Sequence, residues 1–192
     1  MAAFREHWRE RHAPLIARLP GIRRYVQNYP VGAEGETAFD AVAESSFDDT
    51  QAMKALAKSP EYAAVLADEQ NFIDRAGMGS IVTEEQVVKE GPEAGVKRIT
   101  FVTRPPEIPV EEFFRRWREH GARVATDPAV RRYAQCAVRR SIYESGRTPA
   151  FDGAEMAWYD SLEAMNAAPP AAFDASARSP FIAATARSVS IP

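Results

Sequence analysis

Apolar residues near the start of the chain recur at intervals of three and four, which predicts an amphipathic helix with one face toward a core. On a helical wheel this face spans roughly 120°, and it consists of Phe4, Trp8, His12, Leu15, Ile16 and Leu19. The charged residues between them lie outside the face and are expected in solvent. Pro20 and Gly21 end the predicted helix.

Alternation of apolar and polar residues predicts strands after this helix, at residues 22–29, 39–47 and 81–88. A second helical region lies before the last of them. One of residues 48–50 can cap it, Ser59-Pro60 restarts it, and it is expected to run to about Asp74. The first part of the chain therefore combines helices with strands.

The later part of the chain repeats these motifs in the same order. Residues 4–10, 22–27, Phe39-Asp40, Phe47-Asp48, Met53 and Ser59-Pro60 match residues 113–119, 130–135, Phe151-Asp152, Tyr159-Asp160, Met165 and Ser179-Pro180. Matched blocks in one order are hard to obtain by chance, so the sequence predicts a tandem duplication. Repeat 1 covers residues 1–90, repeat 2 covers residues 96–192, and residues 91–95 link them.

Repeat 2 has an extra predicted strand, residues 96–103, ahead of its first helix. The complete unit is therefore β-α-β-β-α-β, the ferredoxin-like pattern of an α+β fold. The first strand of repeat 1 is absent from the chain, which would leave its neighbours in the sheet without hydrogen-bond partners. We expect either that the natural chain begins upstream of Met1 or that another segment fills the gap. In repeat 2 the candidate for the last strand is residues 187–191.

Composition excludes several classes of protein. With 45% hydrophobic and 27% charged residues the chain is typical of a globular protein in water. A net charge of −3 argues against nucleic-acid binding, which requires a basic excess. The single Cys136 excludes an intramolecular disulfide and a cysteine metal cage. No apolar run is long enough to span a membrane and no secretory signal is present, so we expect a cytoplasmic protein without a membrane partner.

His12 is the sharpest candidate for chemistry, because it lies on the apolar face four residues after Trp8. A neutral imidazole there can act as a general base or donate a hydrogen bond to a substrate oxygen. A buried histidine that bonds a backbone carbonyl is the alternative. In repeat 2, counting forward from Trp117 aligns Gly121 with His12, whereas counting back from Tyr133 aligns His120 with it.

Aromatic residues on the same elements could line a pocket. Trp8 and Trp117 fit a core position or a pocket wall, and Tyr25 and Tyr133 fit a pocket hydroxyl or a sheet edge. His7 falls about 60° outside the apolar face of the helix, so we expect it at the surface or the rim.

Ordinary cofactor and metal chemistry finds little support in the sequence. His7 and His12 are five residues apart, the wrong interval for one α-helix face, so we predict no metal site. The carboxylates of Asp68, Glu69 and Asp74 are expected on a solvated helix face. The chain has no phosphate loop, no dinucleotide fingerprint and no serine-hydrolase elbow.

Taken together, the motifs resemble EthD-type domains. Repeat 1 carries the resemblance through residues 4–15, 20–27, 39–47 and 59–74. Repeat 2 keeps Phe113, Trp117, Tyr133, Phe151 and Ser179-Pro180, but has Gly121-Ala122-Arg123 where the family shows His-Ala-Pro-Leu. The resemblance implies a dimeric α/β-barrel arrangement, in which two ferredoxin-like units pack sheet against sheet around a cavity. Two units of one chain could form it, and a homodimer is also compatible.

The resemblance implies oxidoreductase, cyclase or isomerase chemistry on a small apolar or aromatic molecule that carries oxygen, without a dedicated cofactor. His12 would be the acid or base, Tyr25 a hydrogen-bond donor, and Trp8, His120 and Tyr133 would contact the substrate. A non-catalytic binding or accessory protein and a purely structural duplicate are the alternatives. A cavity of roughly 300 Å³ or more lined by His12 would favour the first two of these three. Haem is a further alternative, because a histidine on an apolar helix face can ligate its iron.

Overall fold

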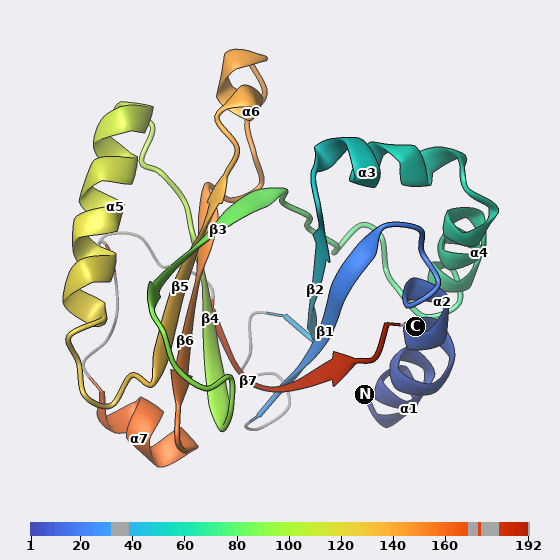
Figure 1. The fold of residues 1–192 in the computed structure, drawn as a ribbon, viewed down its shortest axis with the longest axis horizontal. Coiled ribbons are helices and arrows are strands. Elements are labelled where there is room, and N and C mark those ends of the chain that lie inside the picture. Colours follow the sequence, from blue (N-terminus) through green and yellow to red (C-terminus); the bar gives the residue numbers. More distant parts are fainter. Residues whose placement is uncertain (32–38, 169–172, 174–180, 192) are drawn as a thin grey trace. The chain divides into compact units, whose positions relative to one another are not determined.

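The computed structural model describes residues 1–31, 39–168, 173 and 181–191. The chain forms two compact units (Figure 1). Unit 1 consists of Met1–Tyr29, Asp40–Met78 and Ala186–Pro192, and unit 2 consists of Pro30–Phe39 and Gly79–Thr185. The structure is therefore α+β, as the sequence predicts.

Unit 1 begins with a helix that changes its winding partway along. α1 (Ala2–His7) leads into a π-helical turn, η1 (Trp8–His12), and then into α2 (Ala13–Ile16). The Ala13 N–H donates to the carbonyl of Trp8, five residues earlier, which is the hydrogen bond that defines a π turn. Gly21, with a φ of 77°, then turns the chain into the first strand, as the sequence predicts.

The strands of unit 1 are antiparallel. β1 (Ile22–Pro30) pairs with β2 (Val42–Phe47), and in this register Tyr25 lies opposite Ser45 and Gln27 lies opposite Ala43. The end of β7 (Phe181–Val189) also belongs to this unit, and β7 is the other neighbour of β1 in the strand order.

Three short helices complete unit 1: α3 (Thr50–Ala55), η2 (Leu56–Lys58) and α4 (Pro60–Glu69). Asp49 caps α3 by accepting the Ala52 N–H, and Ser59 caps α4 by accepting the Tyr62 N–H. The sequence predicted a cap at one of residues 48–50 and a restart at Ser59-Pro60, but α4 ends at Glu69 rather than near Asp74. The helices bury an apolar core against β1, formed by Ala13, Ile16, Leu19, Ile22, Tyr25, Leu56 and Val65.

Unit 2 contains the longer helix and most of the strands. Its elements are β3 (Thr83–Lys89), β4 (Val96–Val102), α5 (Val110–Val124), β5 (Arg132–Val138), α6 (Ser141–Glu144), β6 (Gly153–Tyr159), α7 (Leu162–Ala167) and the start of β7. The strand order is β7-β4-β6-β5-β3, and the four neighbouring pairs are antiparallel.

Two strands differ from the sequence prediction. β3, expected as the last strand of repeat 1, pairs with β5 of repeat 2. β7 begins at Phe181, well before the expected residues 187–191, and its first part pairs with β4. In the part of the chain that the structure describes, β2 and β3 each have one strand neighbour, so neither unit contains a closed barrel.

The helix α5 packs its apolar face on the sheet of unit 2 through Phe113, Phe114 and Trp117. The indole of Trp117 lies directly over Gly153, where a Cβ would come within 2.4 Å of the ring. The absence of a side chain at Gly153 therefore sets how closely α5 approaches β6. Among the residues described, no helix is long and apolar enough to cross a membrane.

Candidate functional site

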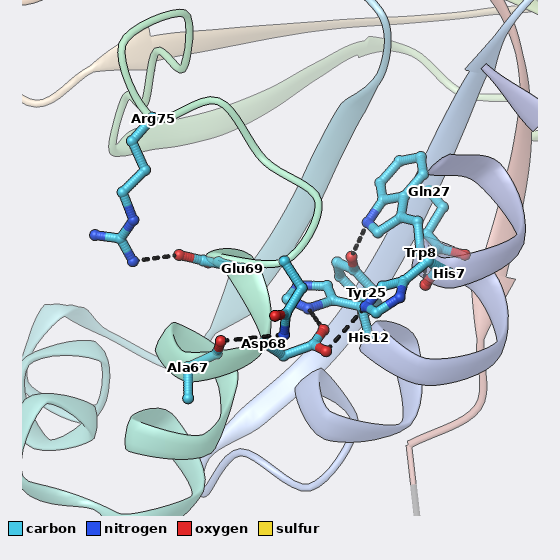
Figure 2. Close-up of polar contacts among 10 residues, drawn as sticks. His7, Trp8, His12, Tyr25, Gln27, Ala67, Asp68, Glu69 and Arg75 are labelled. Atoms are coloured by element: carbon cyan, nitrogen blue, oxygen red, sulfur yellow. Dashed lines mark hydrogen bonds and ion pairs between the residues drawn. The ribbon is translucent and has the colours of Figure 1, made fainter. Parts of the chain in front are cut away.

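Two histidines of unit 1 converge on one carboxylate (Figure 2). Asp68, on α4, places Oδ1 2.9 Å from Nε2 of His7 and Oδ2 2.9 Å from Nδ1 of His12. The two carboxylate oxygens therefore each hold one imidazole. The sequence predicted Asp68 on a solvated helix face, and this is wrong, because its side chain is only 14% exposed.

The π turn is what brings the two histidines together. In a regular α-helix, residues five apart point in different directions, which is why the sequence did not predict that His7 and His12 share a face. A π turn contains about one extra residue, so residues five apart lie above one another. η1 supplies this geometry between His7 and His12. A spacing of five residues puts two side chains on different faces of a regular α-helix, but it puts His7 and His12 on the same face at this π turn.

The same turn explains the two possible alignments of the repeats. The segment from Trp8 to Tyr25 is one residue longer than the segment from Trp117 to Tyr133. In repeat 1 the helix absorbs the extra residue as the π turn, whereas α5 of repeat 2 is a regular α-helix. His120 therefore corresponds to His12, and Gly121 follows it.

A glutamine on the neighbouring strand fixes the helix in both repeats. Gln27 Nε2 donates to the carbonyl oxygen of Trp8 at 2.8 Å, and Gln135 Nε2 donates to that of Trp117 at 2.8 Å. All four residues are buried. The matched Trp and Gln positions of the two repeats therefore share this contact.

The hydrogen bonds assign the protons of the site. An ionised carboxylate only accepts, so His12 donates through Nδ1–H and His7 donates through Nε2–H. Burial raises the pKa of Asp68, but hydrogen bonds from His12 and His7 outweigh it and hold that pKa below its usual range. When the imidazole is neutral, its lone pair is then on Nε2 in His12 and on Nδ1 in His7. This is the arrangement in which a carboxylate orients a histidine for proton transfer.

Phe72 forms an apolar cover on the two imidazoles. Its ring centroid lies 4.6 Å from that of His7 and 5.0 Å from that of His12. Phe4 packs on the same ring of Phe72. The side chain of His12 is 5% exposed and that of His7 is 21% exposed. Approach from solvent is therefore on the His7 side of the cluster.

Tyr25 and Trp8, both predicted site residues, form a pair of their own. The indole Nε1 of Trp8 donates to the hydroxyl of Tyr25 at 2.9 Å, and both side chains are buried. Burial raises the pKa of Tyr25 to about 12, so its hydroxyl is neutral at ordinary pH. The structure joins Tyr25 to Trp8 rather than to His12 (Figure 2).

The remaining predicted residues, His120, Tyr133 and Trp117, cluster in unit 2. Trp117 Nε1 donates a short hydrogen bond to Oε1 of Glu155, and His120 Nε2 lies 3.6 Å from the same oxygen. Burial raises the pKa of the Tyr133 hydroxyl, and the Glu155 charge raises it further. No motif or spacing in the sequence pointed to Glu155, which lies on β6, 35 residues after His120.

A cavity of about 230 Å³ lies in unit 2, lined by Glu84, Glu85, Gln86, Phe114, Trp117, Arg118, Gln135 and Ala137. It is smaller than the expected cavity, and His12 is not part of its lining. Two of its lining residues, Trp117 and Gln135, belong to the hydrogen-bonded network just described.

No group of three or more metal-ligating side chains that could hold a metal ion occurs within the described ranges. What the fold and the site define is an α+β protein built by duplication, with a carboxylate-bound pair of histidines on its first helix. The EthD domain family model matches residues 1–76 and 105–186, so the chain belongs to the EthD family. No curated protein matches the chain.

Proposed function

We propose that this EthD protein is an enzyme that moves protons on a small oxygen-bearing molecule, with His12 as the general base. The observation that carries the proposal is the bridge of Asp68 between His12 and His7, at 2.9 Å to each. Because Asp68 occupies Nδ1 of His12, the other nitrogen, Nε2, is the proton acceptor.

The chemistry needs no co-reactant. Nε2 of His12 takes a proton from a C–H next to a carbonyl, and the electrons of the C–H bond stay on the ligand as an enolate. Return of the proton to a different atom completes an isomerisation or prepares a ring closure. Asp68 stabilises the imidazolium that forms in between. A general base contributes about 10²–10⁴ in rate in such steps.

The surroundings of the histidines favour a largely apolar ligand. Phe72 and Phe4 cover one side of the cluster, and aromatic faces pack well on flat apolar groups. His7, the more exposed histidine, would contact the polar end of the ligand. Tyr25 supports the site through Trp8, and its neutral hydroxyl keeps Trp8 in place.

We further infer that each repeat derives from a ferredoxin-like unit. The order β7-β4-β6-β5 in unit 2 supports this, because it places the first and third strands of repeat 2 between the fourth and second. A barrel-type arrangement of two such units and a homodimer are further parts of this proposal, and oxidoreductase chemistry is the alternative to the proton transfer. The proposed proton transfer requires no cofactor, and a visible absorption spectrum of the purified protein tests the haem alternative.

Elimination of 5-nitrobenzisoxazole tests for the base without knowledge of the natural substrate. Loss of one C–H proton opens the ring of this probe to a coloured phenolate. We expect the protein to accelerate the reaction above its rate in buffer. In the His12→Gln variant, the part of the rate that the His12 site contributes should fall by about a hundredfold. Asp68→Asn should slow it too, because an amide can present a donor to Nδ1 and favour the wrong tautomer.

Glu69→Gln is the matched control, since Glu69 is the next residue of α4 and pairs with Arg75 rather than with a histidine. This variant should react at the wild-type rate. An unchanged rate in His12→Gln, or a wild-type rate equal to that of buffer, would overturn the proposal. Binding of the probe without turnover would favour the non-catalytic binding protein instead.

A further inference from the structure

The cavity of unit 2 lies at a position where repeat 1 carries a tyrosine side chain. Tyr29 comes two residues after Gln27 on β1, and Ala137 comes two residues after Gln135 on β5. Because Gln27 and Gln135 hold the two helices through the same contact, this match rests on that contact and not only on the alignment. Ala137 is therefore the counterpart of Tyr29, and it lines the cavity.

The half-buried side chain of Tyr29 is held by an indole and an amide. Its ring packs on Trp8 at 5.0 Å between ring centroids, and its hydroxyl donates to Oε1 of Gln27 at 2.7 Å. Burial raises the pKa of Tyr29, against the opposing charges of Arg187 and Arg9, so the hydroxyl keeps the proton that it donates. Repeat 1 thus contains a phenol group between a tryptophan and a glutamine, with an arginine nearby.

The tryptophan, the glutamine and the arginine all have counterparts in repeat 2. These are Trp117, Gln135 and Arg118, and each of the three lines the cavity. At the position of the tyrosine, however, repeat 2 has an alanine, residue 137. The side chains that would surround a phenol are therefore present around the cavity, while the chain itself supplies no phenol at this position.

The hydrogen bonds of Gln135 fix the orientation of its amide. Nε2 donates to the carbonyl oxygen of Trp117 at 2.8 Å and to the hydroxyl of Tyr133 at 3.4 Å. A carbonyl oxygen only accepts, so the end of the amide toward Trp117 is the nitrogen and the other end is the acceptor oxygen. Gln27 has the same orientation, and its Oε1 accepts from Tyr29. Oε1 of Gln135 is therefore the acceptor for the hydroxyl of a bound phenol.

The cavity has the size and the lining for one aromatic ring. Its volume is about 230 Å³, and a cavity of roughly 150 Å³ already holds benzene. Phe114 and Trp117 supply aromatic walls, against which a flat ring packs well. The charged residues of the lining have both signs, Glu84 and Glu85 against Arg118, which favours a neutral ligand over an ion.

We propose that the cavity of unit 2 is a binding site for a small phenol, a molecule with one aromatic ring and a free hydroxyl. The ring lies against Trp117, and the hydroxyl donates to Oε1 of Gln135. Tyr29 makes the corresponding contacts in repeat 1. The site goes beyond the proposed function and does not depend on it, because His12 is not part of the cavity lining.

Binding of p-cresol tests the proposal, since this molecule is the side chain of tyrosine on its own. The chain has three tryptophans, so their indole N–H signals in NMR report on each one separately. We expect p-cresol to shift the signal of Trp117 in a saturable way and to leave those of Trp8 and Trp158 nearly unchanged. Toluene, which lacks the hydroxyl, should bind more weakly by a factor of about 2–12, the contribution of one hydrogen bond.

Ala137→Tyr gives repeat 2 the residue that repeat 1 carries. The added ring should occupy the cavity and abolish the saturable shift of Trp117. Ala122→Tyr is the matched control, since Ala122 is exposed on α5 and outside the cavity lining, and this variant should bind p-cresol like the wild type. Circular dichroism checks folding. If Ala137→Tyr does not fold, Ala137→Leu, which fills part of the cavity, replaces it and should weaken binding.

Tyr29→Ala is the reciprocal change in repeat 1. It should open a matching cavity in unit 1, so that p-cresol then also shifts the Trp8 signal and raises the thermal stability of this variant. An unchanged Trp8 signal in folded Tyr29→Ala would contradict the use of Tyr29 as a guide to the ligand.

Two results would overturn the site itself. One is the absence of a saturable Trp117 shift with p-cresol up to its solubility limit, and the other is binding that Ala137→Tyr leaves unchanged. These measurements need no turnover, and they should give the same result in His12→Gln. Failure of the phenol site is therefore distinguishable from failure of the proposed proton transfer.

Discussion

Gln27 donates a hydrogen bond across 2.8 Å to the carbonyl oxygen of Trp8, the carbonyl that opens the π turn. The Ala13 N–H donates to the same oxygen, so the strand and the helix share one acceptor. On its other side the Gln27 amide oxygen accepts from Tyr29 and Arg187. Gln27 therefore connects the π turn to the sheet of unit 1.

Replacement of Gln27 by leucine should destabilise the protein by about 1–3 kcal/mol, because it leaves buried polar partners unpaired. Chemical denaturation measures the free energy of unfolding. Gln51→Leu is the control, since Gln51 is exposed on α3 and its change should stay within about 0.5 kcal/mol. Equal stabilities of the two variants would contradict the role of Gln27.

Asp68 should make the protein lose stability at acid pH. Its folded pKa is lowered, so the stability that it contributes is present above its unfolded pKa, about 3.9, and is lost as pH falls through the folded value. Thermal unfolding from pH 6 downward measures this. Asp68→Asn should be less stable at pH 6 and should show a shallower decline below about pH 4. Parallel curves for the two proteins would refute the assignment.

Tyr25 should make the protein lose stability at alkaline pH. Its pKa is raised to about 12 by burial, so its contribution is fully present below the unfolded pKa, about 10, and is lost as pH rises toward the folded value. Tyr25→Phe removes that dependence, and it also removes the acceptor of the Trp8 indole, at a cost of about 1–2 kcal/mol at neutral pH. Denaturation at pH 7 and pH 10.5 measures both effects.

Gly153 should not tolerate a side chain. A Cβ there would lie 2.4 Å from the indole of Trp117, so Gly153→Ala must displace α5 or the ring and should cost about 1–3 kcal/mol. Gly79→Ala is the matched control, because its Cβ would meet Phe151 at an ordinary 3.9 Å. Denaturation of the two variants should separate them clearly, and a fully stable Gly153→Ala would show that α5 packs differently.

Much of the local structure was predictable from the sequence. The first helix, its end at Gly21, the caps at Asp49 and Ser59, and most strands follow from short-range preferences that act within a few residues. Strand pairing did not follow, since β3 finds its partner in the other repeat. Pairing depends on which edges are free in the folded chain, and no local pattern records that.

Part of the candidate site was likewise predictable from the sequence, and part was not. Spacing alone singled out His12. It placed His7 at the surface or the rim and Asp68 on a solvated helix face, and it gave no reason to join the two, because it assumed regular α-helical winding for the first helix. The one-residue difference between the repeats was visible in the sequence. The sequence did not show that the first helix accommodates the extra residue as a π turn, because that depends on how the helix packs and hydrogen bonds within unit 1.

The sequence by itself determined the duplication, the α+β class and the family, because repeated motifs and periodicity are properties of residue order. Only the tertiary structure decided which carboxylate serves each histidine: Asp68 from helix α4 for His12, and Glu155 from strand β6 for His120. The physical reason is that each partner lies more than 30 residues from its histidine. Contacts at such separation form through packing and strand register.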